Sequence, residues 1–114
     1  MSECLFCRII AGEVPAEKLH EDELVVAIRD VSPRAPVHLL LLPRDHVGSA
    51  REVDDGDGPM LGRLFAVGAR LAAAEGLTER GYRLVTNVGA DAGQSVGHLH
   101  VHLLGGRRLG WPPG

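Results

Sequence analysis

Residues 97–106 read Gly-His-Leu-His-Val-His-Leu-Leu-Gly-Gly, and they decide the fold. Three of the chain's six histidines fall here within five residues, alternating with Leu99 and Val101. In a β-strand every second side chain points to the same face, whereas a helix would scatter the rings around its surface. The alternation therefore predicts a strand that carries His98, His100 and His102 on one face and apolar residues on the other. Because imidazole titrates close to neutral pH, such a face suits a metal ion, a nucleophile or an acid–base pair.

Further strands are predicted on the N-terminal side of this stretch. Residues 37–42 form an apolar run in which His38 precedes four leucines, and residues 82–88 form a second run with Asn87 near its end. Residues 18–20 and 24–28 flank an acidic turn, which is typical of a β-hairpin.

Two helices are also predicted. Residues 4–11 indicate a short helix that glycine and proline end. After Pro59, which suits a first helical turn, apolar residues recur at three- and four-residue spacing up to Gly76. Residues 49–58 are expected to form a polar, acidic loop. The order of short helix, strands, long helix and strands favours an α+β fold with an antiparallel sheet.

The composition bounds the class of protein. With 114 residues the chain is expected to be one domain, residues 1–114, because it is long enough for a single core only. The net charge of −3 argues against broad affinity for nucleic acid or for an anionic membrane. The N-terminus has no basic segment before an apolar run, and no apolar run approaches membrane length. We therefore expect a cytoplasmic protein with no nucleic-acid and no membrane partner.

The loop of residues 89–97 leads directly into the histidine stretch and is rich in glycine. Glycines let backbone N–H groups approach a phosphate closely, and consecutive amides can form an anion-binding nest. Ser95 adds a hydroxyl that can donate to an oxygen or to a leaving nitrogen. The loop is not a P-loop, since no Gly-Lys-Ser/Thr follows it. It is a candidate phosphate-binding element beside the imidazoles.

The pattern His-x-His-x-His followed by two apolar residues identifies the chain as a member of the histidine triad (HIT) superfamily. Further segments resemble the Hint branch, the histidine triad nucleotide-binding proteins: Asp30–His38, Asn87, Gly93–Val96, Leu104–Arg107 and Trp111–Gly114. The resemblance runs from about Cys4 to the last residue. It implies a HIT-like fold, in which a five-stranded antiparallel half-barrel sheet carries one long and one short helix, and it implies a homodimer.

The resemblance also implies roles for single residues. His100 would be the nucleophile that takes a nucleotidyl group from the α-phosphate, His102 would contact the phosphate, His38 would buttress both, and Ser95 would complete the catalytic set. Asp30 would accept from the ribose hydroxyls. The implied substrate-binding residues are Phe6, Ile9, Val14, Asp30, Val31, Leu40, Asn87, Gly93, Gln94, Ser95, His100, His102 and Trp111. Ile28 stands where the family often carries phenylalanine, which affects base stacking.

The two cysteines, Cys4 and Cys7, form a Cys-x-x-Cys pair. In a reducing compartment such a pair is more often a metal or redox pair than a structural disulfide. Tetrahedral zinc needs two more ligands, for which the chain offers His46 and His98. HIT proteins with an N-terminal Cys-x-x-Cys resemble this arrangement. The resemblance implies a structural zinc at these four residues and no cofactor for catalysis; the alternative is a pair of thiols without metal.

The predicted function is hydrolysis of the P–N bond of purine nucleoside 5′-phosphoramidates, such as adenosine 5′-monophosphoramidate, to AMP and an amine. Three alternatives stay open. A non-catalytic nucleotide-binding or regulatory module would bind AMP but leave a phosphoramidate intact. A dinucleoside polyphosphate hydrolase is the main rival within the superfamily, and the Trp-Pro-Pro-Gly tail favours the Hint branch against it. A three-histidine zinc enzyme is weakened because the cysteines compete for the metal and no glutamate lies near as a base.

The tail and the long helix bear on the expected homodimer. A helix with Gly62, Ala66, Gly68 and Ala69 among its apolar positions can approach a second copy closely. Trp111 is the chain's only tryptophan, and we expect this large apolar ring to be buried. The resemblance places it across the interface, near the partner's active site.

Overall fold

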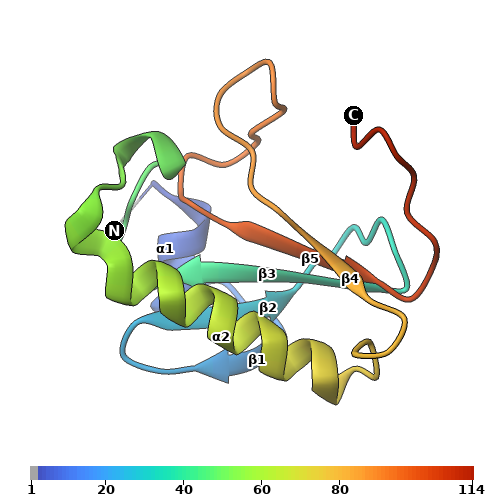
Figure 1. Ribbon diagram of the computed structural model, residues 1–114. Coiled ribbons are helices and arrows are strands. Elements are labelled where there is room, and N and C mark those ends of the chain that lie inside the picture. Colours follow the sequence, from blue (N-terminus) through green and yellow to red (C-terminus); the bar gives the residue numbers. More distant parts are fainter. Residues whose placement is uncertain (1–2) are drawn as a thin grey trace.

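The computed structural model describes residues 3–114, in which a single five-stranded antiparallel sheet supports the rest of the chain (Figure 1). The strands are β1 (Lys18–Glu21), β2 (Val25–Arg29), β3 (Val37–Pro43), β4 (Tyr82–Val85) and β5 (Val101–Gly105). Their spatial order is β1-β2-β3-β5-β4, so the strand that ends the histidine stretch lies beside β3, near the middle of the sheet. The predicted α+β class with an antiparallel sheet and the predicted hairpin are confirmed.

The leucine run of β3 forms the core on both faces of the sheet. Leu39 and Leu41 pack on one face, and Leu40 and Leu42 pack on the other; none of them is more than 6% exposed. A strand that is covered on both faces reads as a continuous apolar run rather than as an alternation. This explains why residues 37–42 lack the polar positions of an ordinary half-buried strand.

The long helix, α2 (Gly58–Ala74), crosses one face of the sheet (Figure 1). Its buried side chains include Leu64 and Val67, which pack against Leu41 of β3. Gly68 lies so close to the sheet that a Cβ atom there would be 2.9 Å from Leu41 Cδ1. The helix ends as predicted near Gly76, whose φ of +76° favours glycine. Gly68 therefore lets α2 pack closely against the sheet of its own chain.

The short helix, α1 (Leu5–Ile10), covers the opposite face. Cys4 is its N-cap, and the Cys4 sulfur accepts a hydrogen bond from the backbone N–H of Cys7. Phe6 and Ile9 are buried against the even-numbered leucines of β3. Because six residues are too few for an isolated helix, α1 depends on these tertiary contacts.

The structure corrects two element predictions. The acidic segment 49–58 contains two 3-10 turns, η1 (Ala50–Glu52) and η2 (Asp55–Asp57): the Ser49 side chain caps the first, and Asp54 and Asp57 cap each other's backbone N–H groups in the second. The strand expected over residues 82–88 ends at Val85, and the hydroxyl of the following residue, Thr86, donates to the carbonyl of His100.

The histidine stretch is also only partly a strand, since β5 begins at Val101 and both His98 and His100 precede it. The carbonyl of His98 accepts from the ring of His100, and the carbonyl of His100 accepts from Thr86. Both carbonyls are therefore bonded outside the sheet. The predicted alternation survives nonetheless, because Leu99 and Val101 pack with α2 while His100 contacts Phe6 of α1.

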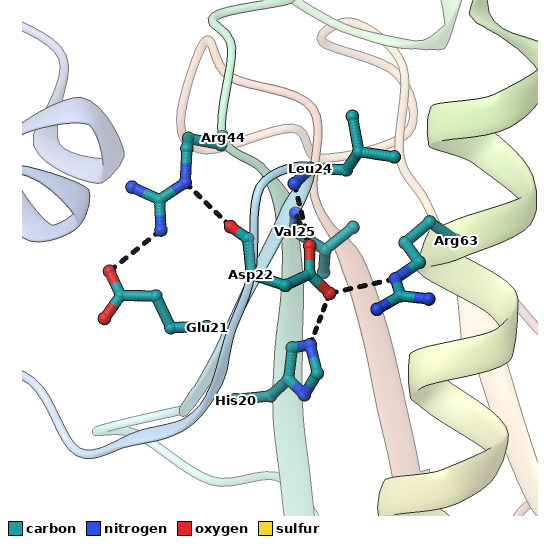
Figure 2. Close-up of polar contacts among 7 residues, drawn as sticks. All are labelled: His20, Glu21, Asp22, Leu24, Val25, Arg44 and Arg63. Carbon is teal, nitrogen blue, oxygen red and sulfur yellow. Dashed lines mark hydrogen bonds and ion pairs between the residues drawn. The ribbon is translucent and has the colours of Figure 1, made fainter.

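The β1–β2 turn is held by Asp22, as Figure 2 shows. One carboxylate oxygen accepts from the backbone N–H groups of Leu24 and Val25, at 2.7 and 2.9 Å. The other accepts from His20 on β1, at 2.5 Å, and from Arg63 on α2, at 2.9 Å. Burial raises the pKa of Asp22, but these hydrogen bonds outweigh it and hold the pKa below its ordinary value. This carboxylate joins the hairpin to the long helix.

The C-terminal tail leaves the sheet after β5 and runs away from it (Figure 1). Trp111 is 81% exposed, so its own chain does not bury it, and its expected burial across a dimer interface stays a prediction. The tail has no strand or helix, and its contacts include a hydrogen bond from Arg83 to the carbonyl of Gly110. Among residues 3–114, no helix is both long enough and apolar enough to cross a bilayer.

Candidate active site

A cavity of about 280 Å³ opens between α1, the β2–β3 loop and the histidine stretch. Its apolar walls come mainly from α1, the segment after it, and strands β2 and β3. Its polar groups include Asp30, Ser95, His100 and His102. The full lining is Leu5, Phe6, Ile9, Val14, Pro15, Ala16, Ile28, Arg29, Asp30, Val31, Leu40, Ser95, Val96, His100 and His102. An apolar slot with a few convergent polar groups is typical of a small-molecule site.

His100 is oriented by its own chain. Its Nδ1–H donates to the carbonyl of His98 over 2.7 Å, because a carbonyl can only accept. The ring is 3% exposed and packs edge-on against Phe6, with centroids 5.0 Å apart. In the neutral ring, Nε2 therefore keeps its lone pair. The arrangement gives His100 a base or nucleophile on the cavity wall.

His102 and His38 are oriented by a hydrogen bond between their rings. The backbone N–H of Arg34 donates to Nδ1 of His38 over 3.0 Å, so the proton of a neutral His38 is on Nε2. This Nε2 lies 2.9 Å from Nδ1 of His102 and donates to it. The proton of His102 is then on Nε2. His102 thus offers the cavity a hydrogen-bond donor.

Burial keeps both rings of this pair neutral. Desolvation, with the neighbouring His100 and His38, lowers the pKa of His102 from 6.5 to about 4. Desolvation also lowers the pKa of His38, although Asp30 acts in the opposite direction. The Asp30 carboxylate lies 3.4 Å from Nε2 of His38 and also accepts from the backbone N–H of Ser32. At neutral pH the pair therefore donates one N–H without carrying charge.

The glycine-rich loop reaches the cavity through Ser95 and Val96 only. Gln94, expected to bind substrate, braces the loop: its oxygen accepts from Gly89 N–H, and its nitrogen donates to the carbonyls of Gly48 and Val96. These bonds use both ends of the amide. Gln94 therefore holds Ser95 beside the imidazoles from outside the cavity.

Most of the predicted site residues meet at this cavity. Those that line it are Phe6, Ile9, Val14, Asp30, Val31, Leu40, Ser95, His100 and His102. His38 lies behind His102, and the lining excludes Asn87, Gly93, Gln94 and Trp111. The sequence prediction missed Leu5, Pro15, Ala16, Arg29 and Val96 as lining residues. Their positions beside predicted residues were a usable signal, since neighbours in a turn or at a strand end often share one pocket.

A larger cleft of about 450 Å³ lies elsewhere, at the end of α2. It is lined by Arg80, Arg107 and Arg108 among others, and by none of the predicted site residues. It lacks the histidines and the apolar walls of the smaller cavity. We therefore assign the candidate chemistry to the smaller cavity.

The four residues predicted to bind zinc converge. Nδ1 of His98 lies 3.4 Å from Cys4 Sγ, 3.5 Å from Cys7 Sγ and 3.2 Å from Nδ1 of His46. Cys7 Sγ is 3.3 Å from Nδ1 of His46. The Nε2–H of His98 donates to the carbonyl of Pro43 over 2.9 Å, which leaves the Nδ1 lone pair for the cluster.

These separations fit a tetrahedral zinc ion. With Zn–S of about 2.3 Å and Zn–N of about 2.0–2.1 Å, tetrahedral geometry separates sulfur from nitrogen by about 3.6 Å and two nitrogens by about 3.4 Å. The observed separations of 3.2–3.5 Å are slightly shorter. The donor set of two sulfurs and two imidazole nitrogens is also one that zinc prefers. The cluster can hold a metal, and it uses His98 rather than the two histidines of the cavity.

Known proteins resemble the chain along nearly its whole length. A family model described as HIT domain matches residues 11–109, a range that begins after the two cysteines. The chain is 50% identical over 115 residues to an uncharacterised HIT-like protein of Synechococcus elongatus, with 100% of both chains covered. It is 44% identical over 108 residues to the purine nucleoside phosphoramidase of Escherichia coli strain K12, covering 95% of this chain and 91% of that protein.

The solved structures agree. The crystal structure of a HIT family hydrolase from Legionella pneumophila superposes with a TM-score of 0.96 at 49% identity, covering 98% of this chain and 100% of that one. The sheet order and the two helices described above are thus those of a HIT fold. With a family model that spans most of the chain and relatives near half identical along its whole length, this protein belongs to the HIT family, as the histidine motif predicts.

Proposed function

We propose that this protein hydrolyses the P–N bond of purine nucleoside 5′-phosphoramidates. The single observation that carries the proposal is the orientation of His100, whose Nδ1–H is bonded to the His98 carbonyl so that Nε2 is left as a nucleophile on the cavity wall. The phosphoramidase of Escherichia coli, 44% identical over 108 residues, supports the choice of bond. The apolar slot beside His100 suits a purine, and Asp30 suits the ribose hydroxyls.

In the first step, Nε2 of His100 attacks the α-phosphorus. A nitrogen–phosphorus bond to His100 forms as the phosphorus–amine bond breaks, and the amine leaves with a proton. The Ser95 hydroxyl at the cavity edge is the donor that we assign to the leaving nitrogen. His102 is held neutral with its proton on Nε2, and it donates this N–H to a phosphoryl oxygen.

In the second step, water attacks the phosphorus of the nucleotidyl-histidine. The proton that the water loses passes to the Ser95 oxygen and restores the hydroxyl, the bond to His100 breaks, AMP is released, and the imidazole regains its neutral form. The His98 carbonyl holds the Nδ1 proton of His100 through both steps, so the same nitrogen attacks and leaves. The residues of the chain are sufficient for this cycle, and no step passes through the Cys/His cluster.

The cluster of Cys4, Cys7, His46 and His98 holds a structural zinc ion in this proposal. The four ligand atoms all lie within 4.8 Å of one another. When bound, the ion would cross-link the N-terminal helix to the segment before β5, which is the chemistry a closed four-ligand site supplies. Elemental analysis of protein purified without chelator, with Cys4→Ser/Cys7→Ser as control, tests for about one zinc per chain.

A homodimer completes the proposal. Within one chain, Phe65 on α2 is 57% exposed, Tyr82 at the start of β4 is 38% exposed, and Trp111 is 81% exposed. Exposed aromatic rings of this size favour burial against a partner surface. The predicted small helix residues Gly62, Ala66 and Ala69 are exposed too, so a second copy can approach α2 closely there. Light scattering tests for twice the mass of one chain.

The decisive experiment incubates the purified protein with adenosine 5′-monophosphoramidate and follows the release of AMP. Turnover is expected, whereas a non-catalytic module would bind AMP and leave the phosphoramidate intact. Diadenosine tetraphosphate at the same concentration tests the alternative of a dinucleoside polyphosphate hydrolase. Faster cleavage of the polyphosphate than of the phosphoramidate would overturn the assigned bond.

A further inference from the structure

The Cys/His cluster and the nucleotide cavity share a wall. Phe6 lies between the two cysteines on α1, and its ring packs edge-on against both His98, at 5.9 Å, and His100, at 5.0 Å between centroids. Phe6 also lines the cavity. One side chain therefore contacts a proposed metal ligand, the proposed nucleophile and the proposed base pocket.

A second connection runs through the backbone of His98. Its ring nitrogens are used by Pro43 and by the cluster, and its carbonyl accepts the Nδ1–H of His100 over 2.7 Å. A displacement of His98 would thus move the acceptor that selects the tautomer of His100. His98 is fully buried, whereas Cys4, the N-cap of the six-residue helix α1, and Cys7 within it are partly exposed. Of the two sides of the cluster, α1 is the one that can move.

The two sulfurs and two imidazole nitrogens of the cluster all lie within 4.8 Å of one another. A zinc ion between them would bond to all four, and its binding free energy would stabilise the geometry in which α1 lies against His98. Apolar contacts of Phe6 and Ile9 also hold α1, but a helix this short has little stability of its own.

From these contacts we propose that Cys4, Cys7 and His46 are positioning residues for the nucleotide site. By holding a zinc ion against His98, they fix α1 as the wall of the base pocket and keep the His98 carbonyl in place for His100. The metal ion would therefore control affinity for the nucleotide, and its loss would weaken AMP binding before it unfolds the protein. This inference rests on the proposed function for the identity of the ligand and deepens it.

The test compares the zinc-loaded protein, the same protein stripped by a chelator, and the Cys4→Ser/Cys7→Ser variant. AMP affinity is measured by calorimetry, and hydrogen exchange is followed separately in α1 and α2, well below the temperature of unfolding. Loss of the metal should weaken AMP binding by about tenfold, equivalent to about 1.4 kcal/mol. Exchange should accelerate in α1 while α2 stays protected.

Two controls separate positioning from general stability. Arg8→Gln removes a side chain of α1 that pairs with Glu13 and belongs neither to the four cluster residues nor to the cavity lining, so the variant should bind zinc and AMP normally. Added zinc should restore AMP affinity to the stripped wild-type protein but not to the double variant. If the ion were purely structural, its removal would lower the midpoint of thermal unfolding and leave AMP affinity unchanged.

Equal AMP affinity and equal α1 exchange with and without zinc would overturn the inference, and so would a wild-type protein that binds no zinc. These outcomes differ from failure of the proposed reaction. A protein that releases no AMP from the phosphoramidate, yet shows zinc-dependent AMP affinity and α1 exchange, refutes the proposed hydrolysis and supports the positioning role.

Discussion

His38 donates its Nε2–H to Nδ1 of His102 across 2.9 Å, and this one bond determines which nitrogen of each ring carries a proton. It joins β3 to β5 directly behind the cavity. The direction of this bond is set by the backbone N–H of Arg34, which donates to the other nitrogen of His38, so neither ring of the pair can gain a proton without breaking a hydrogen bond. Part of the pH dependence of stability follows from this pair.

The unfolding free energy should fall as the pH drops from about 6.5 towards 4. The pKa of His102 is lowered from 6.5 to about 4, so the unfolded chain binds a proton in this range while the folded protein resists it. The stability associated with neutral His102 is thus fully present above pH 6.5 and is lost as the pH falls through the folded pKa. Urea denaturation at several pH values measures the slope, which should be shallower in His102→Gln; equal slopes would exclude His102 as its source.

Replacing His100 with alanine should abolish turnover and spare binding. The ring supplies the proposed nucleophile, whereas the apolar walls and Asp30 remain. We expect the rate of AMP release to fall by at least about a thousandfold, with AMP affinity within about threefold of wild type. Rapid quenching with labelled substrate should trap labelled wild-type protein and no labelled variant. A variant that turns over at the wild-type rate would refute the assignment.

Removal of the tail before Arg108 should change substrate preference more than stability. Trp111 is 81% exposed within its chain, so its loss uncovers little apolar surface. In the proposed dimer, the tail instead reaches the partner's cavity, where it would contact the amine portion of the substrate. The measurement is kcat/KM for a small and a bulky phosphoramidate in the full-length and truncated proteins. An unchanged ratio, with normal dimer mass, would contradict the role across subunits.

Two glycines of α2 should respond oppositely to alanine. A Cβ on Gly68 would lie 2.9 Å from Leu41 Cδ1, so Gly68→Ala should lower the unfolding free energy by about 1–3 kcal/mol through overpacking. A Cβ on Gly62 meets nothing of its own chain within 4 Å, so Gly62→Ala should raise the unfolding free energy of the single chain by about 0.5–1 kcal/mol through helix propensity. Urea denaturation of both variants measures the two changes in unfolding free energy. Destabilisation of similar size in both would argue against close packing at Gly68.

Replacing Asp22 with asparagine should loosen the hairpin from the helix. Its carboxylate accepts from Leu24, Val25, His20 and Arg63, and an amide cannot accept from all four (Figure 2). We expect a loss of about 1–3 kcal/mol in unfolding free energy. Glu23→Gln removes the neighbouring exposed carboxylate and serves as the matched control, with a change within about 0.5 kcal/mol. Equal effects of the two substitutions would mean that charge alone, rather than the hydrogen bonds, is responsible.

Local patterns predicted the elements that have a clear period. The three- and four-residue spacing after Pro59 predicts α2, and the leucine run predicts β3, because burial imposes those periods on any sequence that folds this way. The boundary errors occur where side chains replace backbone partners. Thr86 bonds to the His100 carbonyl, and Asp54 and Asp57 cap a loop; nothing in a one-dimensional pattern shows that such side chains end a strand or start a 3-10 turn.

The sequence by itself determined the family, the antiparallel α+β sheet and the chemical inventory, since these depend on residue types and on spacing along one strand. Tertiary structure alone decided the orientation and the role of each histidine. His98 faces the cysteines because Pro43, 55 positions away, accepts its Nε2–H, and His102 carries its proton on Nε2 because His38, 64 positions away, donates to its Nδ1. A tautomer is set by the partner of the opposite ring nitrogen, and that partner comes from a distant strand. Tertiary structure also left Trp111 exposed, because a tail beyond the last strand has no core of its own chain to enter.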